Sequence, residues 1–320
     1  MITRRQLLQH TALTAAAVCA PACGPAVARA DDQPAPFRMR HLLASALYGD
    51  LPLAEILPEV AATGCDALDV WCKVHGTQRE QATTLGDEAF AALLKHHGVR
   101  LGCSTKYPGG PTKQQEEMAW VKRHGGSLIV TGSRSVAKGQ PEPSGDEAKA
   151  VIRHLLDDLA PHLARAAELD VTLALENHTG QILCHPDSLR YFAEFNRSPH
   201  LGVSFAPHQL FRWADQIPSL IRDLGAAHLP HVYFQEESPA RYRLMAKEIE
   251  LQQLPGFGGG LDYQPLIQAL RDVHFTGWVE LFMHPTPRGQ PILPTIPEIR
   301  AVLAKARSYI DGCVAKTAAR

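Results

Sequence analysis

The sequence lacks the features that mark several large classes of protein. Aromatic residues make up only 7% of its 320 residues, and no lysine- and arginine-rich run of the kind that binds a polyanion occurs. We therefore expect no nucleic-acid binding. The Ala-rich apolar stretch at residues 11–20 is shorter than the roughly 20 residues that a membrane-spanning helix needs, so no membrane span is predicted.

Paired cysteine motifs are also missing. Beyond the first thirty residues the cysteines are Cys65, Cys72, Cys103, Cys184 and Cys313. Their number is odd and no C-x-x-C spacing occurs, so the pattern does not indicate a disulfide framework. Because most of them lie in apolar contexts, we expect buried free thiols.

The beginning of the chain has the pattern of an export signal. Thr3-Arg4-Arg5-Gln6-Leu7-Leu8 is similar to the twin-arginine motif, and Ala28-Arg29-Ala30 has the small-x-small form of a cleavage site. We expect residues 1–30 to be a twin-arginine signal peptide and residues 31–38 a linker. The protein is then predicted to be periplasmic or otherwise exported.

From residue 39 onward, short apolar strands alternate with amphipathic helices. The predicted strands are 40–47, 66–71, 99–104, 127–131, 171–176, 201–205, 228–234 and 277–282. The predicted helices are 52–63, 88–97, 113–124, 147–168, 187–196, 217–224, 263–273 and 296–310.

Eight strand–helix units in about 290 residues are typical of one (β/α)8 barrel. We therefore predict an α/β protein with a single TIM barrel at residues 39–312 and a C-terminal tail at residues 313–320. A doubly wound open sheet is the alternative, but the first strand–helix turn contains no G-x-G-x-x-G sequence.

The fifth predicted strand carries the clearest signal for a functional site. Its apolar residues 171–175 run directly into Glu176, Asn177 and His178. In a parallel barrel, functional side chains come from the loops that follow the strands. A carboxylate that closes an apolar strand costs desolvation energy unless it is paired or bound to a metal. Glu176 is therefore the first candidate, and a merely solvated strand end is the alternative.

Four stretches match motifs that occur together in one group of barrels. They are Leu175-Glu176-Asn177-His178, Leu201-Gly202-Val203-Ser204-Phe205, Pro255-Gly256-Phe257-Gly258 followed by Asp262-Tyr263, and Phe275-Thr276-Gly277-Trp278-Val279-Glu280. On these stretches the chain resembles the xylose-isomerase-like TIM-barrel superfamily of sugar isomerases and epimerases. The resemblance implies an enzyme that removes a proton next to a carbonyl of a free or keto sugar, leading to isomerisation, epimerisation or elimination.

The resemblance further implies one divalent metal ion, held by a Glu after strand five, an Asp after strand six, a His or Gln on strand seven and a Glu on strand eight. Only Glu176 matches cleanly. Ala206 stands at the sixth-strand position and Tyr233 at the seventh, and the last position falls on Phe282 or on Glu280.

Two interpretations remain open for the metal. In the first, a rebuilt site that suits Mn, Co or Zn is formed by Glu176, His208, His231, Gln235 and Glu280. In the second, no metal is bound, and the barrel is a metal-free enzyme or a non-catalytic carbohydrate-binding protein.

Roles for individual residues follow from the resemblance and from their places after the strands. The predicted catalytic residues are Glu176, Glu280 and Lys106. The predicted substrate-binding residues are Trp71, His178, Gln209 and His284. The partner is expected to be a small sugar or sugar derivative, and the sequence leaves open whether the chain forms a homo-oligomer.

An apurinic endonuclease, another function of this superfamily, is disfavoured. Once the three arginines of the leader are subtracted from the 32 basic residues, 29 remain against 33 acidic ones. A basic DNA-binding groove is not expected from such a balance.

Overall fold

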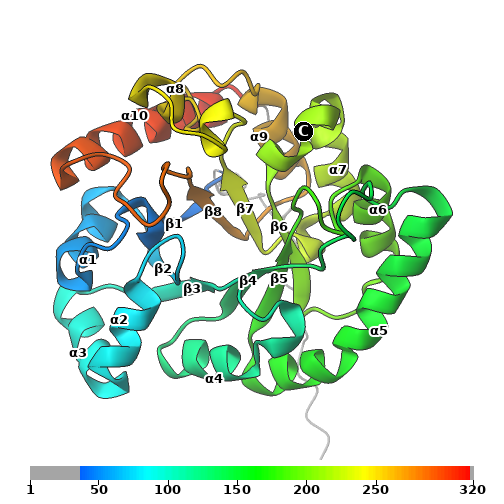
Figure 1. The fold of residues 1–320 in the computed structure, drawn as a ribbon, viewed down its shortest axis with the longest axis horizontal. Helices are drawn as coiled ribbons and strands as arrows, with labels where there is room; N and C mark the ends of the chain where they lie inside the picture. Colours follow the sequence, from blue (N-terminus) through cyan, green and yellow to red (C-terminus); the bar gives the residue numbers. More distant parts are fainter. Residues whose placement is uncertain (1–36, 318–320) are drawn as a thin grey trace, which may run out of the picture. The chain divides into compact units, whose positions relative to one another are not determined.

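Eight short strands close into a parallel barrel in the computed structural model, which describes residues 37–317 (Figure 1). In chain order they are β1 (Arg40–Ala44), β2 (Ala67–Trp71), β3 (Leu101–Thr105), β4 (Leu128–Gly132), β5 (Thr172–Glu176), β6 (Leu201–Phe205), β7 (His231–Phe234) and β8 (Trp278–Leu281). Each strand pairs with the next, and β8 pairs with β1 to close the sheet. The predicted (β/α)8 barrel is confirmed.

Helices surround the barrel on its outside (Figure 1). They are α1 (Leu53–Ala62), α2 (Gln78–Leu85), α3 (Asp87–His97), α4 (Gln115–Arg123), α5 (Gly145–Leu169), α6 (Pro186–Phe195), α7 (Ile217–Leu224), α8 (Lys247–Leu251), α9 (Tyr263–Asp272) and α10 (Ile296–Ala315). The 3-10 segment η3 (Pro207–Gln216) connects β6 to α7.

Burial on both faces explains why the strands read as nearly continuous apolar runs. Every residue of β2, β3, β4 and β6 is buried, as expected when side chains point alternately into the barrel and toward the helices. The helices have one apolar face. In α7 the buried residues are Ile217, Leu220, Ile221 and Leu224, which are spaced to lie on the side that faces the sheet.

The element boundaries differ from the prediction where the local pattern changes. The first strand ends at Ala44 instead of residue 47, because Ser45–Leu47 turn into a 3-10 segment. The α2 helix was not predicted, since its sequence QREQATTL has no apolar stripe. The last helix extends five residues beyond the predicted end and buries Cys313 within the predicted tail.

The cysteines match the prediction of free thiols, since none of the five forms a disulfide and four of them are buried. Within residues 37–317 no helix is long and apolar enough to cross a membrane. The predicted signal peptide and nearly all of the predicted linker lie outside the described residues.

Gly202 on β6 packs closely against the segment that leads into β7. A Cβ atom at this position would lie 2.3 Å from Cδ of Pro230. Gly202→Ala should therefore lower the free energy of unfolding, by roughly 1–3 kcal/mol, measured by urea denaturation.

Gly312 in α10 is the matched control, because a Cβ atom there meets nothing within 4 Å. Gly312→Ala should raise the free energy of unfolding by roughly 0.4–1 kcal/mol, since alanine loses less backbone entropy in a helix. Equal effects of the two substitutions would contradict this account of the barrel packing.

Candidate active site

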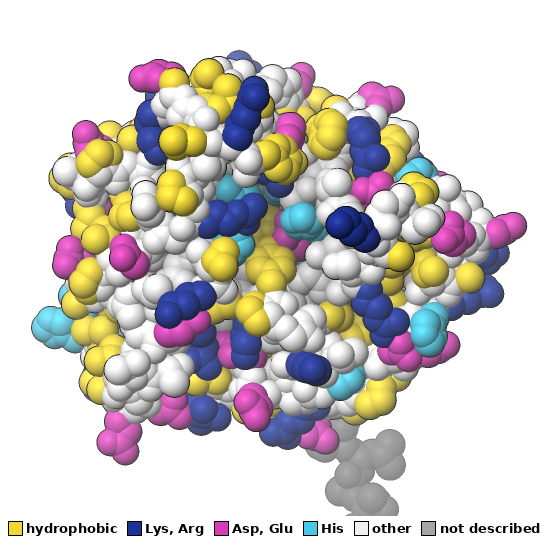
Figure 2. Space-filling view, in the orientation of Figure 1, with side chains coloured by type: hydrophobic (Ala, Val, Ile, Leu, Met, Phe, Trp, Pro, Cys, Tyr) yellow, Lys and Arg dark blue, Asp and Glu magenta, His cyan; other side chains and the backbone are white. Residues whose placement is uncertain are grey.

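A cavity of about 110 Å³ opens at the carboxyl ends of the strands. The central cavity, as we call it, is lined by Trp71, His75, Tyr107, Glu176, His178, Gln181, Tyr233, Gln235, Phe282, His284 and Arg288. Figure 2 shows the molecule hollowed near the middle of this face, with hydrophobic side chains at the bottom and histidine, basic and acidic side chains around them. Its volume lies below the roughly 300–1,000 Å³ of drug-sized ligand sites, so the cavity suits a small ligand.

The floor of the central cavity is aromatic. Trp71, the last residue of β2, stacks on Phe282 with ring centroids 4.4 Å apart and an interplanar angle of 9°. The ring of Tyr233 on β7 lies 5.7 Å from that of Phe282. Such a surface excludes water and offers an apolar face to the C–H groups of a sugar ring.

Among residues 37–317, Glu176 is the only carboxylate that lines the central cavity. It is the last residue of β5 and only 4% exposed. The hydroxyl of Tyr107, two residues beyond the end of β3, donates a hydrogen bond to its Oε2 atom. Burial raises the pKa of Tyr107 well above its usual value, so the phenol stays protonated and acts as a donor.

One buried polar atom of the cavity wall, Oε1 of Gln235, has no hydrogen-bond partner among the described residues. Buried polar groups in folded proteins are nearly always hydrogen-bonded, to protein, water or a ligand. This oxygen is therefore free to accept a hydrogen bond from a molecule in the cavity.

Arg288 supplies the positive charge of the central cavity. Its Nη1 atom lies 3.2 Å from Nε2 of His75 and 3.4 Å from Nδ1 of His284. Burial lowers the pKa of His75 to about 3 and that of His284 well below its usual value. Both imidazoles are therefore neutral at physiological pH and accept hydrogen bonds from the guanidinium.

A second group of polar side chains lies inside the barrel and does not line the central cavity. Glu280 is fully buried, and its Oε2 atom is 3.5 Å from Nε2 of His231. Thr105 donates a hydrogen bond of 2.6 Å to Asp69. Burial raises the pKa of Glu280 to about 8, and burial together with the charge of Glu280 raises that of Asp69 well above its usual value. Burial therefore favours the protonated form of both acids, and Glu280 is mainly protonated at neutral pH.

The chain matches one family of barrels over most of its length. The model of the xylose isomerase-like TIM barrel family aligns with residues 57–305. The chain belongs to the xylose isomerase-like TIM barrel family. A comparison with curated protein sequences gave no significant match.

Solved structures of this xylose isomerase-like fold superpose on the chain at low sequence identity. D-psicose 3-epimerase with D-tagatose from Clostridium cellulolyticum H10 has a TM-score of 0.65 and 13% identity, covering 86% of this chain and 99% of its own. The 3-keto-D-glucoside 4-epimerase from E. coli has a TM-score of 0.61 and 18% identity, covering 85% and 100%. A xylose isomerase domain protein from Alicyclobacillus acidocaldarius has a TM-score of 0.62 and 15% identity, covering 87% and 99%. At these identities the likeness shows the fold alone.

The structure brings only part of the predicted site of this xylose isomerase-like barrel together. The predicted residues that line the central cavity are Trp71, Glu176, His178, Gln235 and His284. Of the two candidates for the last carboxylate position, Phe282 lines the cavity and Glu280 lies in the barrel interior.

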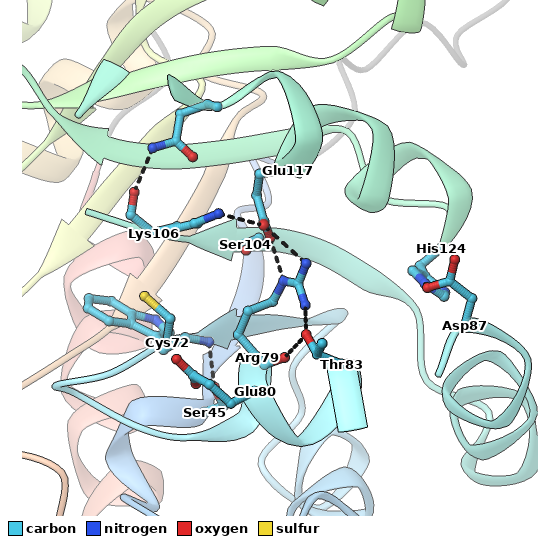
Figure 3. A network of polar contacts seen from close by, with 12 residues as sticks. Ser45, Cys72, Arg79, Glu80, Thr83, Asp87, Ser104, Lys106, Glu117 and His124 are labelled. Carbon is cyan, nitrogen blue, oxygen red and sulfur yellow. Dashed lines mark hydrogen bonds and ion pairs between the residues drawn. The ribbon is translucent and has the colours of Figure 1, made fainter. Parts of the chain in front are cut away.

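Lys106 does not line the central cavity. Its Nζ atom is 3.2 Å from Oε2 of Glu117, which also pairs with Arg79 and accepts a hydrogen bond from Ser104 (Figure 3). This network joins the end of β3 to α2 and α4. The predicted catalytic lysine is thus used in packing the barrel wall.

Gln209 and His208 are also placed elsewhere. The Oε1 atom of Gln209 accepts hydrogen bonds of 3.2 and 2.9 Å from the backbone N–H and hydroxyl of Thr179, which tie the loop after β5 to the one after β6. His208 lines a second cavity of about 530 Å³ between η3 and residues 259–266.

Four residues that line the central cavity had no role predicted from the sequence: His75, Tyr107, Gln181 and Arg288. The first three follow predicted strands or the fifth-strand motif, so their positions in the chain were a usable signal. Arg288 lies six residues beyond Phe282 in a loop without a motif, and only the fold brings it to the site.

The residues of the central cavity do not fit the divalent metal site that the family implies. Ala206 and Tyr233 replace two ligands, and the five residues proposed for a rebuilt site do not form one cluster. Within residues 37–317, no group of three or more His, Cys, Asp or Glu side chains is arranged to hold a metal ion.

The buried acid Glu280 predicts a pH dependence of stability. A glutamate titrates near 4.5 when unperturbed, whereas Glu280 in the folded protein titrates at about 8. The stability that the protonated acid provides is therefore lost as the pH rises from about 4.5 to about 8. The side chain of Glu280→Gln is neutral at every pH. Between pH 5 and pH 9 the free energy of unfolding of this variant should therefore rise by more than about 1 kcal/mol relative to that of wild type.

This difference is measured by urea denaturation at several pH values. Glu194 on α6 is exposed, so Glu194→Gln is the control. The difference in free energy of unfolding between this variant and wild type should stay constant across that pH range. A constant difference for Glu280→Gln as well would show that Glu280 is ionised in the folded protein at neutral pH.

Proposed function

We propose that this barrel is a sugar isomerase-like enzyme in which Glu176 removes a proton from the carbon next to a carbonyl group. The proposal rests chiefly on one observation. Glu176 is the only carboxylate in a cavity with an aromatic floor, and the phenol of Tyr107 donates a hydrogen bond to it. Membership of the xylose isomerase-like family and the likeness to sugar epimerase folds support the same chemistry.

The proposed step moves one proton and one electron pair. Glu176 takes the proton on a carboxylate oxygen, the C–H electrons form a carbon–carbon double bond, and the carbonyl electrons move to oxygen. Tyr107 engages only Oε2, so Oε1 has no hydrogen-bond partner among the described residues and is available for the proton. The oxygen that has become negative then takes the hydroxyl proton of the neighbouring carbon. The carbonyl re-forms on that neighbouring carbon, and the former carbonyl carbon takes the proton back from Glu176.

A single carboxylate favours isomerisation over epimerisation. Isomerisation can use one base, which carries the proton between adjacent carbons on the same face of the substrate. Epimerisation by two acids needs a second carboxyl group on the opposite face, and Glu280, the other predicted catalytic acid, does not line the cavity. The free Oε1 atom of Gln235 in the cavity wall supports the binding of a hydroxyl group of a free sugar.

Export is a separate part of the proposal. Arg4-Arg5 and the apolar stretch behind them support a twin-arginine signal. A protein outside the cytoplasm would meet free sugars more often than sugar phosphates, so we propose a free or oxidised sugar as the substrate.

Glu176→Gln tests the proposed base. The amide retains an oxygen that can accept from Tyr107 but cannot remove a proton at neutral pH. Exchange of the C–H hydrogen next to the carbonyl of D-fructose or D-tagatose, followed by NMR in deuterated water, should slow by roughly 10²–10⁴-fold.

Glu194→Gln on α6, the helix that follows the same strand, is exposed and should exchange at the wild-type rate. If wild type binds sugars but catalyses no exchange, and Glu176→Gln loses only some affinity, the barrel is a carbohydrate-binding protein and the enzymatic proposal is wrong.

A further inference from the structure

Arg288 differs from Arg79 and Arg241 in having no acidic partner among the described residues, and it is an exposed residue that lines the central cavity. Arg79 pairs with Glu117, and Arg241 pairs with Glu237. No carboxylate of the described residues lies within 4.0 Å of Arg288. Because Arg288 is exposed at the central cavity and has no counter-ion among residues 37–317, its guanidinium is open to an anion or oxygen acceptor that enters the cavity.

Only one edge of the Arg288 guanidinium is occupied. Both neighbouring imidazoles, His75 and His284, lie against Nη1. No hydrogen bond involves Nε or Nη2 within the described part of the chain. The imidazoles thus orient the group and leave its remaining donors for a ligand in the central cavity.

The Arg288 guanidinium and the Glu176 carboxylate belong to residues that line the same cavity. The negative charge of Glu176 favours the charged form of Arg288 against the effect of burial.

The positions that hold a metal in the family's pattern carry side chains that cannot ligate one here. Ala206 has no donor atom, and Phe282 has none either. Tyr233 is buried and carries a phenol, which is a weaker metal ligand than the imidazole or amide of the family's pattern. The cavity nevertheless retains a fixed positive charge at Arg288.

We propose that Arg288 takes the place of the family's metal ion, binding the substrate carbonyl oxygen and stabilising the negative charge that forms on it. This inference rests on the proposed proton abstraction by Glu176. When Glu176 takes the proton it becomes neutral, and the negative charge passes to the substrate oxygen beside Arg288. The total charge of the cavity is unchanged, so no further cation is required.

The test combines metal removal with substitution of Arg288. Wild-type protein that has been treated with EDTA and dialysed should retain its rate of hydrogen exchange on D-fructose. Its melting temperature should not rise on addition of Mn, Co or Zn ions. Arg288→Ala should lower the exchange rate by roughly 10²–10³-fold, the usual cost of removing one oxyanion donor.

Chemical rescue separates a direct role from a structural one. Guanidinium chloride at low, non-denaturing concentration should restore part of the activity of Arg288→Ala, because the small cation can occupy the vacated space. Arg288→Lys retains the charge without the planar fork and should show an intermediate rate, which gives a second measurement if the alanine variant folds poorly. Arg243→Met, in an exposed position of the loop after β7, should match wild type.

Each outcome decides between the two proposals. Exchange that is abolished by EDTA and restored by Mn, Co or Zn would overturn the role of Arg288 and leave Glu176 as the base. The role of Arg288 would also be overturned if Arg288→Ala exchanged hydrogen at the wild-type rate. The same holds if neither added guanidinium nor the lysine substitution restored the lost activity. In both cases the proposed role of Glu176 would stand. If wild type shows no exchange with or without added metal, the proposed function itself is wrong.

Discussion

Closure of the sheet between β1 and β8 is the constraint on which the rest of this structure depends. Because all eight strands are parallel, closure brings their carboxyl ends to one rim. Residues separated by more than two hundred positions in the chain, such as Trp71 and Phe282, then stack on one another. The aromatic floor, the single carboxylate above it and the cation beside it are all consequences of that closure.

The two acids on the inward faces of β5 and β8 have different surroundings. Glu176 borders a cavity and is held by a phenol, whereas Glu280 lies beneath the aromatic floor with a second acid, Asp69, near it. Burial favours the neutral form of a carboxyl group, and a neighbouring acid strengthens the effect. The sequence resemblance alone would treat both as catalytic acids, but their depth in the barrel separates a residue of the cavity from an interior one.

Much of the candidate site could be predicted from the chain, because the ends of barrel strands are visible as points where an apolar run meets polar residues. Glu176 was found in this way. Lys106 and Gln209 also have suitable chemistry, but the structure places them in contacts with Glu117 and Thr179 and not in the central cavity. Arg288 was missed, since a residue in a long loop has no periodic pattern that shows which way the loop folds.

The sequence by itself determined the eightfold alternation of strands and helices, the order of the strands and the face on which each side chain lies, because these follow from local periodicities of two and 3.6 residues. Only the tertiary structure decided how deep each inward side chain lies. Glu280 and Phe282 share one face of β8 and its extension, yet stacking against Trp71 places Phe282 at the cavity and leaves Glu280 below it. Depth depends on the stagger between neighbouring strands and on the packing of side chains from distant parts of the chain, and neither leaves a local pattern.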